Sequence, residues 1–156
     1  MRADELLQVA GLRRTKAREA VLSLLCKAER PMAHHEIAVS PEADRLDRVT
    51  LYRTLTALQG AGLVHRVQGV DGVWRFRAHA TERVECPGNH PHFLCLSCGE
   101  MSCLDAQTLP WVSVPEGTEV KGKQLVVYGR CRRCAAAHRE EERRVAMAPS
   151  DEPRSL

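Results

Sequence analysis

Two pairs of cysteines constrain the fold of this chain more than any other feature. Each pair has the form Cys-x-x-Cys, and the four residues are Cys95, Cys98, Cys131 and Cys134. A Cys-x-x-Cys turn directs both sulfurs at one point, so two turns complete a tetrahedron around Zn²⁺. The 32 residues between the pairs are enough chain for a strand, a short helix and a strand. The pattern predicts one structural zinc ion in a closed site that holds the fold and performs no catalysis.

The composition offers little from which to build a large core. Only six residues are aromatic, two each of Trp, Tyr and Phe. We therefore expect that neither half of the chain forms a large apolar core, and that small domains depend on metal or on a partner subunit. Cys26 lies on the apolar side of a predicted helix, where its thiol fits core packing.

The start of the chain and its hydropathy indicate the compartment. The first residues, MRADELLQVAGLRR, hold acids and no long apolar stretch, which argues against a secretory signal. No run of about eighteen apolar residues is present, so no transmembrane segment and no membrane partner are expected. We expect a cytoplasmic protein whose thiols stay reduced or bind metal.

The first third of the sequence predicts two helices. Residues 14–28 form an amphipathic helix with Thr15 as a candidate N-cap, because apolar residues recur at i, i+3, i+4 and i+7 from Val21 onward. Pro31 ends this helix, and residues 33–39 predict a short second one.

A third helix begins after Asp47, its expected cap, and ends at the glycines near residues 60–62. Its two faces differ. Leu51, Leu55 and Leu58 share the side that we expect to enter a core. The opposite side carries Val49, Arg53 and Thr56, flanked by Tyr52.

Residues 63–69 and 72–79 then predict two strands joined as a hairpin through the sequence GVDG. Helices followed by a hairpin are typical of a winged helix-turn-helix, which we place at residues 1–80. This part holds 13 Lys and Arg against 9 Asp and Glu, so double-stranded DNA is a candidate partner.

The rest of the chain predicts a smaller second domain. We expect a hinge at residues 81–88, an α/β dimerisation and metal-binding domain at residues 89–145, and a polar tail at residues 146–156. Strands are expected at residues 92–98 and 123–131, and a helix at 135–146. The fold class is therefore α+β.

Further nitrogen and sulfur ligands lie near the first cysteine pair. They are His65, His79, Cys86, His90, His92 and Cys103. His90 and His92 would face the same side of a strand, and a returning strand could bring Cys103 near them. Imidazole and thiolate without carboxylate suit Zn²⁺ better than Fe²⁺ or Mn²⁺. These residues are our candidates for a regulatory metal site, with surface histidines and a buried thiol as the alternative.

Four stretches carry a resemblance to a known family. GLRRTKAREAVLSLL, RVTLYRTLTALQGAGLVHRV, HPHFLCLSCG and GRCRRC, in this order across residues 11–134, resemble the ferric uptake regulator family. The resemblance implies a dimeric, metal-dependent repressor that binds a palindromic operator and controls metal-uptake genes. It also implies that Cys95, Cys98, Cys131 and Cys134 form the structural zinc site.

The resemblance also assigns DNA contacts. It implies that the helix with Tyr52 and Arg53 is the recognition helix, with Thr50 beside them. Phosphate contacts are expected from the basic residues near the start of the chain, which are Arg13, Arg14, Lys16 and Arg18.

Departures from the family pattern favour zinc as the sensed metal. Pro31 and Met32 stand where iron-sensing members have a histidine, and Arg77 stands where they have a glutamate. A third family site is also changed, with its positions held by Asn89, Pro91, Trp111 and Lys123. His65 and Cys103, in contrast, sit at ligand positions of zinc-sensing members. We expect one structural and one regulatory zinc ion per chain.

Three alternatives accompany this interpretation. An iron- or nickel-sensing regulator is the nearest one within the family. A thiol oxidoreductase would need Cys-x-x-Cys at the start of a helix after a strand, which CLSCGEMSC does not offer. A zinc-ribbon interaction module would leave the helix with Tyr52 and Arg53 without a role. No enzyme activity and no small organic substrate are expected.

Overall fold

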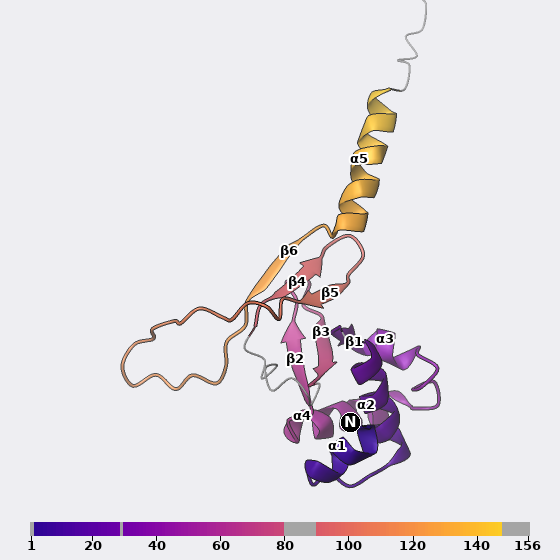
Figure 1. The fold of residues 1–156 in the computed structure, drawn as a ribbon, viewed down its shortest axis with the longest axis vertical. Helices are drawn as coiled ribbons and strands as arrows, with labels where there is room; N and C mark the ends of the chain where they lie inside the picture. The colour runs from indigo at the N-terminus through magenta and orange to yellow at the C-terminus, as the bar shows by residue number, and fades with distance from the viewer. Residues whose placement is uncertain (1, 29, 80–89, 148–156) are drawn as a thin grey trace, which may run out of the picture.

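The computed structural model describes residues 2–28, 30–79 and 90–147 (Figure 1). Within them the chain is α+β as predicted, with a winged-helix head followed by a smaller sheet and one long helix. The predicted hinge at 81–88 and nearly all of the predicted tail lie outside the described residues. The domain limits proposed above therefore stay predictions.

Four helices build the head, and two of them begin at the predicted caps. They are α1 (Ala3–Val9), α2 (Lys16–Ala28), α3 (His34–Ala38) and α4 (Arg48–Gly60). The hydroxyl of Thr15 accepts a hydrogen bond from the Arg18 amide at 3.3 Å. The carboxylate of Asp47 accepts the amides of Val49 and Thr50, both at 2.9 Å. These side chains satisfy amides that have no partner within the helix.

Helix α1 and a two-residue strand were not predicted from the sequence. Helix α1 buries only Leu6 and Leu7, too few positions to show a helical period. The strand is β1 (Met32–Ala33), whose identity comes from its pairing with Phe76 and Arg75 rather than from its own pattern.

The wing hairpin forms as predicted. It consists of β2 (Val64–Gln68) and β3 (Trp74–Ala78), which pair antiparallel from Val64 with Ala78 to Gln68 with Trp74. Gly72 lies in the connecting turn at φ +75°, a conformation that glycine adopts without strain. The sheet of the head has the order β1-β3-β2.

The head contains a substantial core, so the expectation of a small core was wrong for this half. Leucines and other aliphatic side chains fill it in place of aromatic ones. Leu51, Leu55 and Leu58 are at most 1% exposed, as predicted for the inner face of α4. Cys26 packs against the edge of this core.

The C-terminal half meets the expectation of a small core. Its elements are β4 (His92–Cys95), β5 (Met101–Cys103), β6 (Val126–Gly129) and α5 (Arg132–Ala146). Strand β4 lies in the centre, antiparallel to β5 and parallel to β6. Among the described residues, the buried apolar cluster consists of Leu94 and Met101 together with Val67 of the wing, and the partly buried Val126 packs against it. Helix α5 buries no residue and projects away from the sheet (Figure 1).

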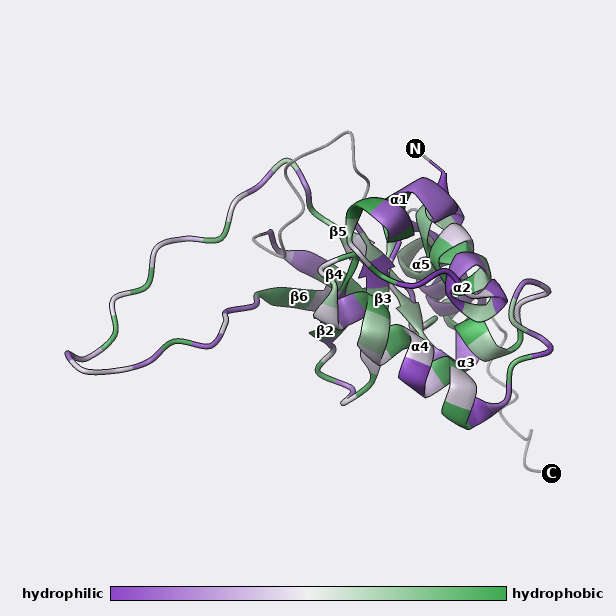
Figure 2. Cartoon of the chain, turned by 90° about the horizontal axis from the view of Figure 1, so that it is seen from below, coloured by the Kyte–Doolittle hydropathy of each residue, from purple (hydrophilic) through white to green (hydrophobic). Residues whose placement is uncertain are grey.

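A long loop replaces the short helix that we expected between the cysteine pairs. Residues 104–125 form neither helix nor strand. Pro110 and Pro115 interrupt this segment, and a proline inside a helix removes a hydrogen bond and clashes with the preceding turn. Apolar and polar residues alternate along the loop, which extends away from both sheets (Figure 2). Trp111 on it is 88% exposed.

Among the described residues, the helices are too short or too polar to cross a membrane.

Candidate metal centres

The two Cys-x-x-Cys turns meet, as their spacing predicted. The sulfurs of Cys95, Cys98, Cys131 and Cys134 all lie within 4.8 Å of one another. The first pair sits on the turn that leaves β4, and the second sits where β6 passes into α5. Because β4 and β6 are parallel neighbours, both turns follow the carboxyl ends of their strands at the same end of the sheet. Four sulfurs at this spacing fit a tetrahedral zinc site.

The hydrogen bonds of this cysteine cluster favour thiolate at its buried member. Backbone amides, first that of Cys131 at 3.3 Å from the sulfur, lower the pKa of Cys95 to about 6. Hydrogen bonding to the Cys131 sulfur raises the pKa of Cys134. Without a cation, the sulfurs thus share protons unequally, and Zn²⁺ binds the thiolate form. The donor set therefore fits Zn²⁺.

The second pair has the placement that a thiol oxidoreductase would need, which the sequence analysis considered only for the first pair. Cys131 is the N-cap of α5 and is separated from the end of β6 by one residue, Arg130. Its sulfur nevertheless lies within 4.8 Å of the sulfurs of Cys95 and Cys98. A redox pair would keep its two sulfurs apart from further thiols, whereas this arrangement offers four ligands to one ion.

A second cluster joins the wing to the C-terminal sheet. Ring nitrogens of His65 on β2, His90 before β4 and His92 on β4 lie within 4.8 Å of one another. The ring centroids of His90 and His92 are 4.5 Å apart, in agreement with the prediction that both face one side. The His65 centroid lies 5.8 Å from that of His92. Three imidazoles from two parts of the fold thus converge on one point.

Two of the three histidines, His65 and His92, have buried ring nitrogens without the hydrogen-bond partners that such atoms normally have in the described part of the chain. Neither ring nitrogen of His65 or of His92 has a hydrogen-bond partner among the described residues. Residue His92 is 1% exposed and His90 is 3% exposed. Buried polar side chains are nearly always hydrogen-bonded, and a metal ion is one group that satisfies such nitrogens.

Burial also keeps these imidazoles neutral, which is the form that binds metal. Desolvation, followed by the neighbouring histidines, lowers the pKa of His65 to about 3. Desolvation and then His90 lower the pKa of His92 to about 4. Desolvation likewise lowers the pKa of His90, although Asp105 opposes it. At neutral pH these side chains are available as ligands without losing a proton.

The structure adds a carboxylate that the sequence analysis did not find. Ligand atoms of His90, Cys103 and Asp105 also lie within 4.8 Å of one another, so two ligand sets share His90. Cys103 is brought there by β5, where it pairs with His92. Asp105 follows Cys103 by two residues, and this spacing is the signal that was overlooked. The statement that the site lacks a carboxylate was wrong.

A cation borders the same site. A guanidinium nitrogen of Arg77 lies 3.8 Å from Asp105, and a ring nitrogen of His90 lies 3.9 Å from the same carboxylate. Arg77 occupies the position at which the resemblance implied a glutamate in iron-sensing relatives. The positive charge of Arg77 lowers the pKa of His65 and His92. At His92 it opposes the carboxylate of Asp105, which raises that pKa.

The remaining metal candidates differ in their placement. The ring of His79 stacks near that of His65, with centroids 4.8 Å apart, but His79 is in neither ligand set. Cys86 lies outside the described residues.

The candidate DNA contacts lie on the head, and some of their side chains form hydrogen bonds or ion pairs within the protein. Tyr52 is 65% exposed and Arg53 is exposed beside it on α4. The Thr50 hydroxyl donates to Asp47 at 2.6 Å, so it belongs to the helix cap.

The basic residues near the start of α2 divide in a similar way. Arg14 pairs with Glu19 at 2.6 Å, and Arg18 donates to the carbonyl of Arg13 at 2.6 Å. Arg13 and Lys16 are exposed, which makes them the better candidates for phosphate contacts.

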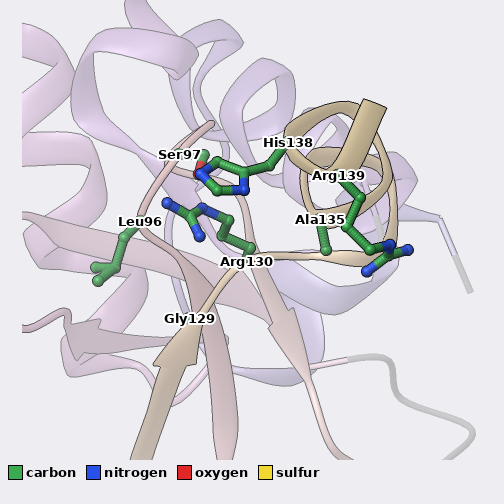
Figure 3. A pocket seen from close by; sticks show the side chains of 7 residues that line it. All are labelled: Leu96, Ser97, Gly129, Arg130, Ala135, His138 and Arg139. Carbon is green, nitrogen blue, oxygen red and sulfur yellow. The ribbon is translucent and has the colours of Figure 1, made fainter. Parts of the chain in front are cut away.

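An open cavity of about 540 Å³ borders the cysteine cluster on the side of α5 (Figure 3). The lining residues come from the turn after β4, the end of β6 and one side of α5: Leu96, Ser97, Gly129, Arg130, Ala135, His138 and Arg139. No candidate ligand of either cluster lines it.

The lowered histidine pKa values predict a pH dependence for protein that retains the zinc of the four cysteines and has no ion at the histidines. Between about pH 3 and 6.5 the unfolded chain binds more protons than the folded one, because His65 and His92 stay neutral when folded. The stability they provide is fully present above the unfolded pKa and is lost as the pH falls through this interval. We expect the urea midpoint of this form of the protein to drop between about pH 7 and about pH 5.

The control for this prediction is a chain with glutamine at both positions. His65→Gln with His92→Gln should flatten the pH dependence, whereas His138→Gln on α5 should leave it unchanged. Equal slopes for the wild type and the double variant would contradict the assignment.

The sequence matches the model of the Ferric uptake regulator family over residues 9–114. Ferric uptake regulation protein 1 of Mycolicibacterium fortuitum is 35% identical over 101 residues, which are 64% of this chain and 59% of that protein. Ferric uptake regulation protein 2 of the same organism is 29% identical, and the match covers 86% of this chain and 93% of that protein.

Solved structures share the fold. A zinc-bound manganese uptake regulator superposes with a TM-score of 0.59 at 20% identity, over 84% of this chain and 99% of that one. The ferric uptake regulator of Vibrio cholerae gives 0.57 at 21% identity, over 82% and 98%. A structure described as holo XcZur gives 0.53 at 23% identity, over 86% and 99%.

The family match covers more than half of the chain and includes the winged helix and the first cysteine pair. The chain therefore belongs to the ferric uptake regulator family, whose members are metal-responsive transcription regulators and not enzymes.

Proposed function

We propose that this protein is a zinc-responsive repressor that binds a palindromic operator as a homodimer. The observation that carries the proposal is the histidine cluster, in which His65 of the wing meets His90 and His92 of the C-terminal sheet. A ligand set that spans two parts of a fold is suited to fix their relative position. The DNA-binding head would then be held in one orientation when the set is occupied.

Zinc fits the ligands of this cluster better than iron does. The inner set consists of three imidazoles, and Cys103 adds a sulfur next to His90. Imidazole and thiolate are common zinc ligands, and a fourth position can be filled by a cysteine, a carboxylate or water. When bound, the ion would supply the charge and the directional bonds that the buried nitrogens of His65 and His92 lack.

The coupling between metal binding and DNA binding requires only a small free energy. Occupancy shifts the orientation of the head only by the difference in metal affinity between the two arrangements. A coupling of about 1–3 kcal/mol corresponds to a roughly 5–150-fold change in DNA affinity. The chain contributes to that coupling by placing His65 of the wing next to His90 and His92 of the sheet.

The dimer is supported by exposed apolar groups in the C-terminal half. Tyr128 on β6 is 58% exposed, Val127 is 47% exposed, and the loop presents Trp111 at 88%. Apolar surface of this kind is commonly buried between subunits. Two heads related by a twofold axis would place two copies of α4 in successive major grooves, which accounts for a palindromic operator.

Arg53 provides a direct test of the DNA interface. Replacing Arg53 with alanine should weaken specific operator binding by about 1–3 kcal/mol, because a bidentate contact with guanine would be lost. Fluorescence anisotropy with the operator and with scrambled DNA measures the effect. Arg143→Ala removes the same charge from an exposed position in the last turn of α5 and should leave the affinity within about twofold. An Arg53→Ala protein with unchanged operator affinity would remove this residue from the interface.

An iron- or manganese-sensing regulator is the second candidate, favoured by one specific observation. Asp105 lies within reach of His90 and Cys103, and a carboxylate is a ligand that Fe²⁺ and Mn²⁺ prefer. The two Mycolicibacterium relatives are named ferric uptake regulation proteins. Against this candidate stands Arg77, whose guanidinium lies 3.8 Å from the same carboxylate.

A metal series separates the two candidates. The operator affinity of protein that retains only the structural zinc would be measured with added Zn²⁺, Fe²⁺, Mn²⁺ and Ni²⁺ at equal free concentrations. The proposal expects Zn²⁺ to strengthen binding at the lowest free concentration. Stimulation by Fe²⁺ or Mn²⁺ that disappears in Asp105→Asn would instead support the second candidate.

A further inference from the structure

The wing hairpin contacts the C-terminal sheet through residues that belong to neither metal cluster. Val67 of β2 is 3% exposed and packs with Leu94 and Met101 in the only apolar cluster found for the described C-terminal residues. Gln124 accepts a hydrogen bond from the Gln68 amide at 3.4 Å and donates one to the Gln68 carbonyl at 3.3 Å. The head is therefore in contact with the sheet independently of the histidines.

Arg75 on β3 lies at the centre of this contact. The residue is 3% exposed, and its guanidinium donates to both carboxylate oxygens of Asp71, at 3.1 and 2.8 Å. One of its nitrogens also donates to the carbonyl of Gly99 at 2.9 Å. Gly99 directly follows Cys98, so this hydrogen bond joins the wing to the turn that carries the first pair of zinc-ligand candidates.

A separate backbone hydrogen bond, also made by Gly99, closes that turn. The amide of Gly99 donates to the carbonyl of Cys95 at 2.9 Å, which closes the turn. Gly99 has a φ of +73°, which any other residue type would adopt only with strain. The carbonyl that Arg75 binds thus belongs to the turn that positions the sulfurs of Cys95 and Cys98.

Close packing on the wing side leaves Arg75 little freedom. A Cβ atom at Gly69 would lie 2.4 Å from Asp71 and 2.8 Å from the guanidinium of Arg75. It would also lie 2.9 Å from Leu94 of the sheet. The turn of the wing is therefore pressed against both the arginine and the C-terminal strand.

A buried guanidinium is stable only while its acceptors stay in place. Rearrangement of the Cys95–Cys98 turn would remove the Gly99 carbonyl and leave Arg75 with acceptors on the wing alone, the carboxylate of Asp71 and the carbonyl of Val73 at 3.3 Å. Displacement of the wing would, conversely, remove a donor from the turn. Because thermodynamic coupling is reciprocal, each side must affect the other by the same factor.

We propose that Arg75 is a positioning residue that couples zinc at the four cysteines to the orientation of the wing. The structural zinc site then supports the DNA-binding head directly, through one side chain, in addition to holding the C-terminal fold. This inference rests on the proposed assignment of zinc to the four cysteines, and it does not depend on the histidine cluster.

The test compares Arg75→Gln with Arg66→Gln in the full-length protein. Arg66 lies on the same hairpin, but it is exposed and its guanidinium lies 4.3 Å from the centre of the Trp74 ring. The two variants therefore lose the same charge from one element, and only the first loses the link to Gly99. Asp71→Asn is a second, more conservative variant, which keeps the guanidinium of Arg75 and weakens its interaction with residue 71.

Two quantities are measured after the zinc content has been counted. Competition with a chelator gives the zinc affinity of the cysteine site, and hydrogen exchange gives the protection of the amides in β2 and β3. We expect Arg75→Gln to lower the zinc affinity and the wing protection by similar factors, roughly 5–150-fold. Asp71→Asn should shift both in the same direction by less, and Arg66→Gln should shift neither. Exchange in α2 and α4 should stay slow in every variant.

Zinc affinity is the discriminating readout, since a residue that merely stabilised the hairpin would not change it. Unchanged zinc affinity in Arg75→Gln and Asp71→Asn would overturn the inference, and so would unchanged wing protection in both. A wild-type protein without zinc at the four cysteines would instead overturn the metal assignment, and the initial zinc count shows which of the two has failed.

Discussion

Replacing His92 with alanine is expected to abolish the zinc response of operator binding while leaving the zinc of the four cysteines in place. His92 is 1% exposed, and both of its ring nitrogens lack a hydrogen-bond partner among the described residues. Its removal deletes one of the three imidazoles that join the wing to the sheet. The DNA affinity with zinc should fall to the value without it, a loss of roughly 5–150-fold for a coupling of about 1–3 kcal/mol.

This prediction is measured by titrating zinc into protein and operator at fixed salt, because DNA affinity depends steeply on ionic strength. His138→Ala removes an imidazole from the surface of α5 and serves as the matched control. Cys103→Ser should reduce the response as well if its sulfur is the fourth ligand. A wild-type zinc response in both His92→Ala and Cys103→Ser would show that the sensor lies elsewhere.

Replacing Cys98 with serine is expected to have the largest effect on stability. Within its described residues, the C-terminal half has a buried apolar cluster of only Leu94 and Met101 with Val67, so packing cannot replace the metal. Structural zinc sites contribute about 10–16 kcal/mol of apparent binding free energy, which becomes folding free energy. We expect Cys98→Ser to lose the structural zinc, to unfold the C-terminal half and to dissociate the dimer.

Zinc content, sedimentation and hydrogen exchange of β4 to β6 check this second prediction. Cys26→Ala is the matched control, because it removes a thiol that packs at the edge of the head core. That variant should keep its zinc and its dimeric state. A stable Cys98→Ser dimer devoid of that zinc would argue against a structural role for the four cysteines.

The helix caps, the cysteine site and the inner face of α4 could be predicted, because each depends on residues close together in the sequence or on a regular spacing. Asp47 and Thr15 were recognisable as caps because their oxygens bond amides two or three residues away. The four cysteines carry their geometry in their spacing, and parallel pairing of β4 with β6 brings the two turns together. The inner face of α4 followed from its helical period.

The features that were missed depend on contacts between distant segments. The hydrogen bond from Arg75 to Gly99 spans 24 residues, and nothing in either neighbourhood indicates it. His65 meets His92 only because the wing docks on the sheet, so its role came from family resemblance and not from spacing. Asp105, in contrast, could have been predicted from the sequence, because a residue two positions beyond Cys103 can lie on the same side of the chain as Cys103.

An ion held at the histidine cluster, between wing and sheet, is proposed to set the DNA affinity. The most direct test measures operator affinity and zinc content on one sample, before and after mild chelation that removes only the weaker-bound ion. We expect two zinc ions per chain at first, one after chelation, and a parallel fall in operator affinity that added zinc reverses. Unchanged operator affinity after loss of the weaker-bound zinc, or a purified protein that contains no zinc at all, would contradict it.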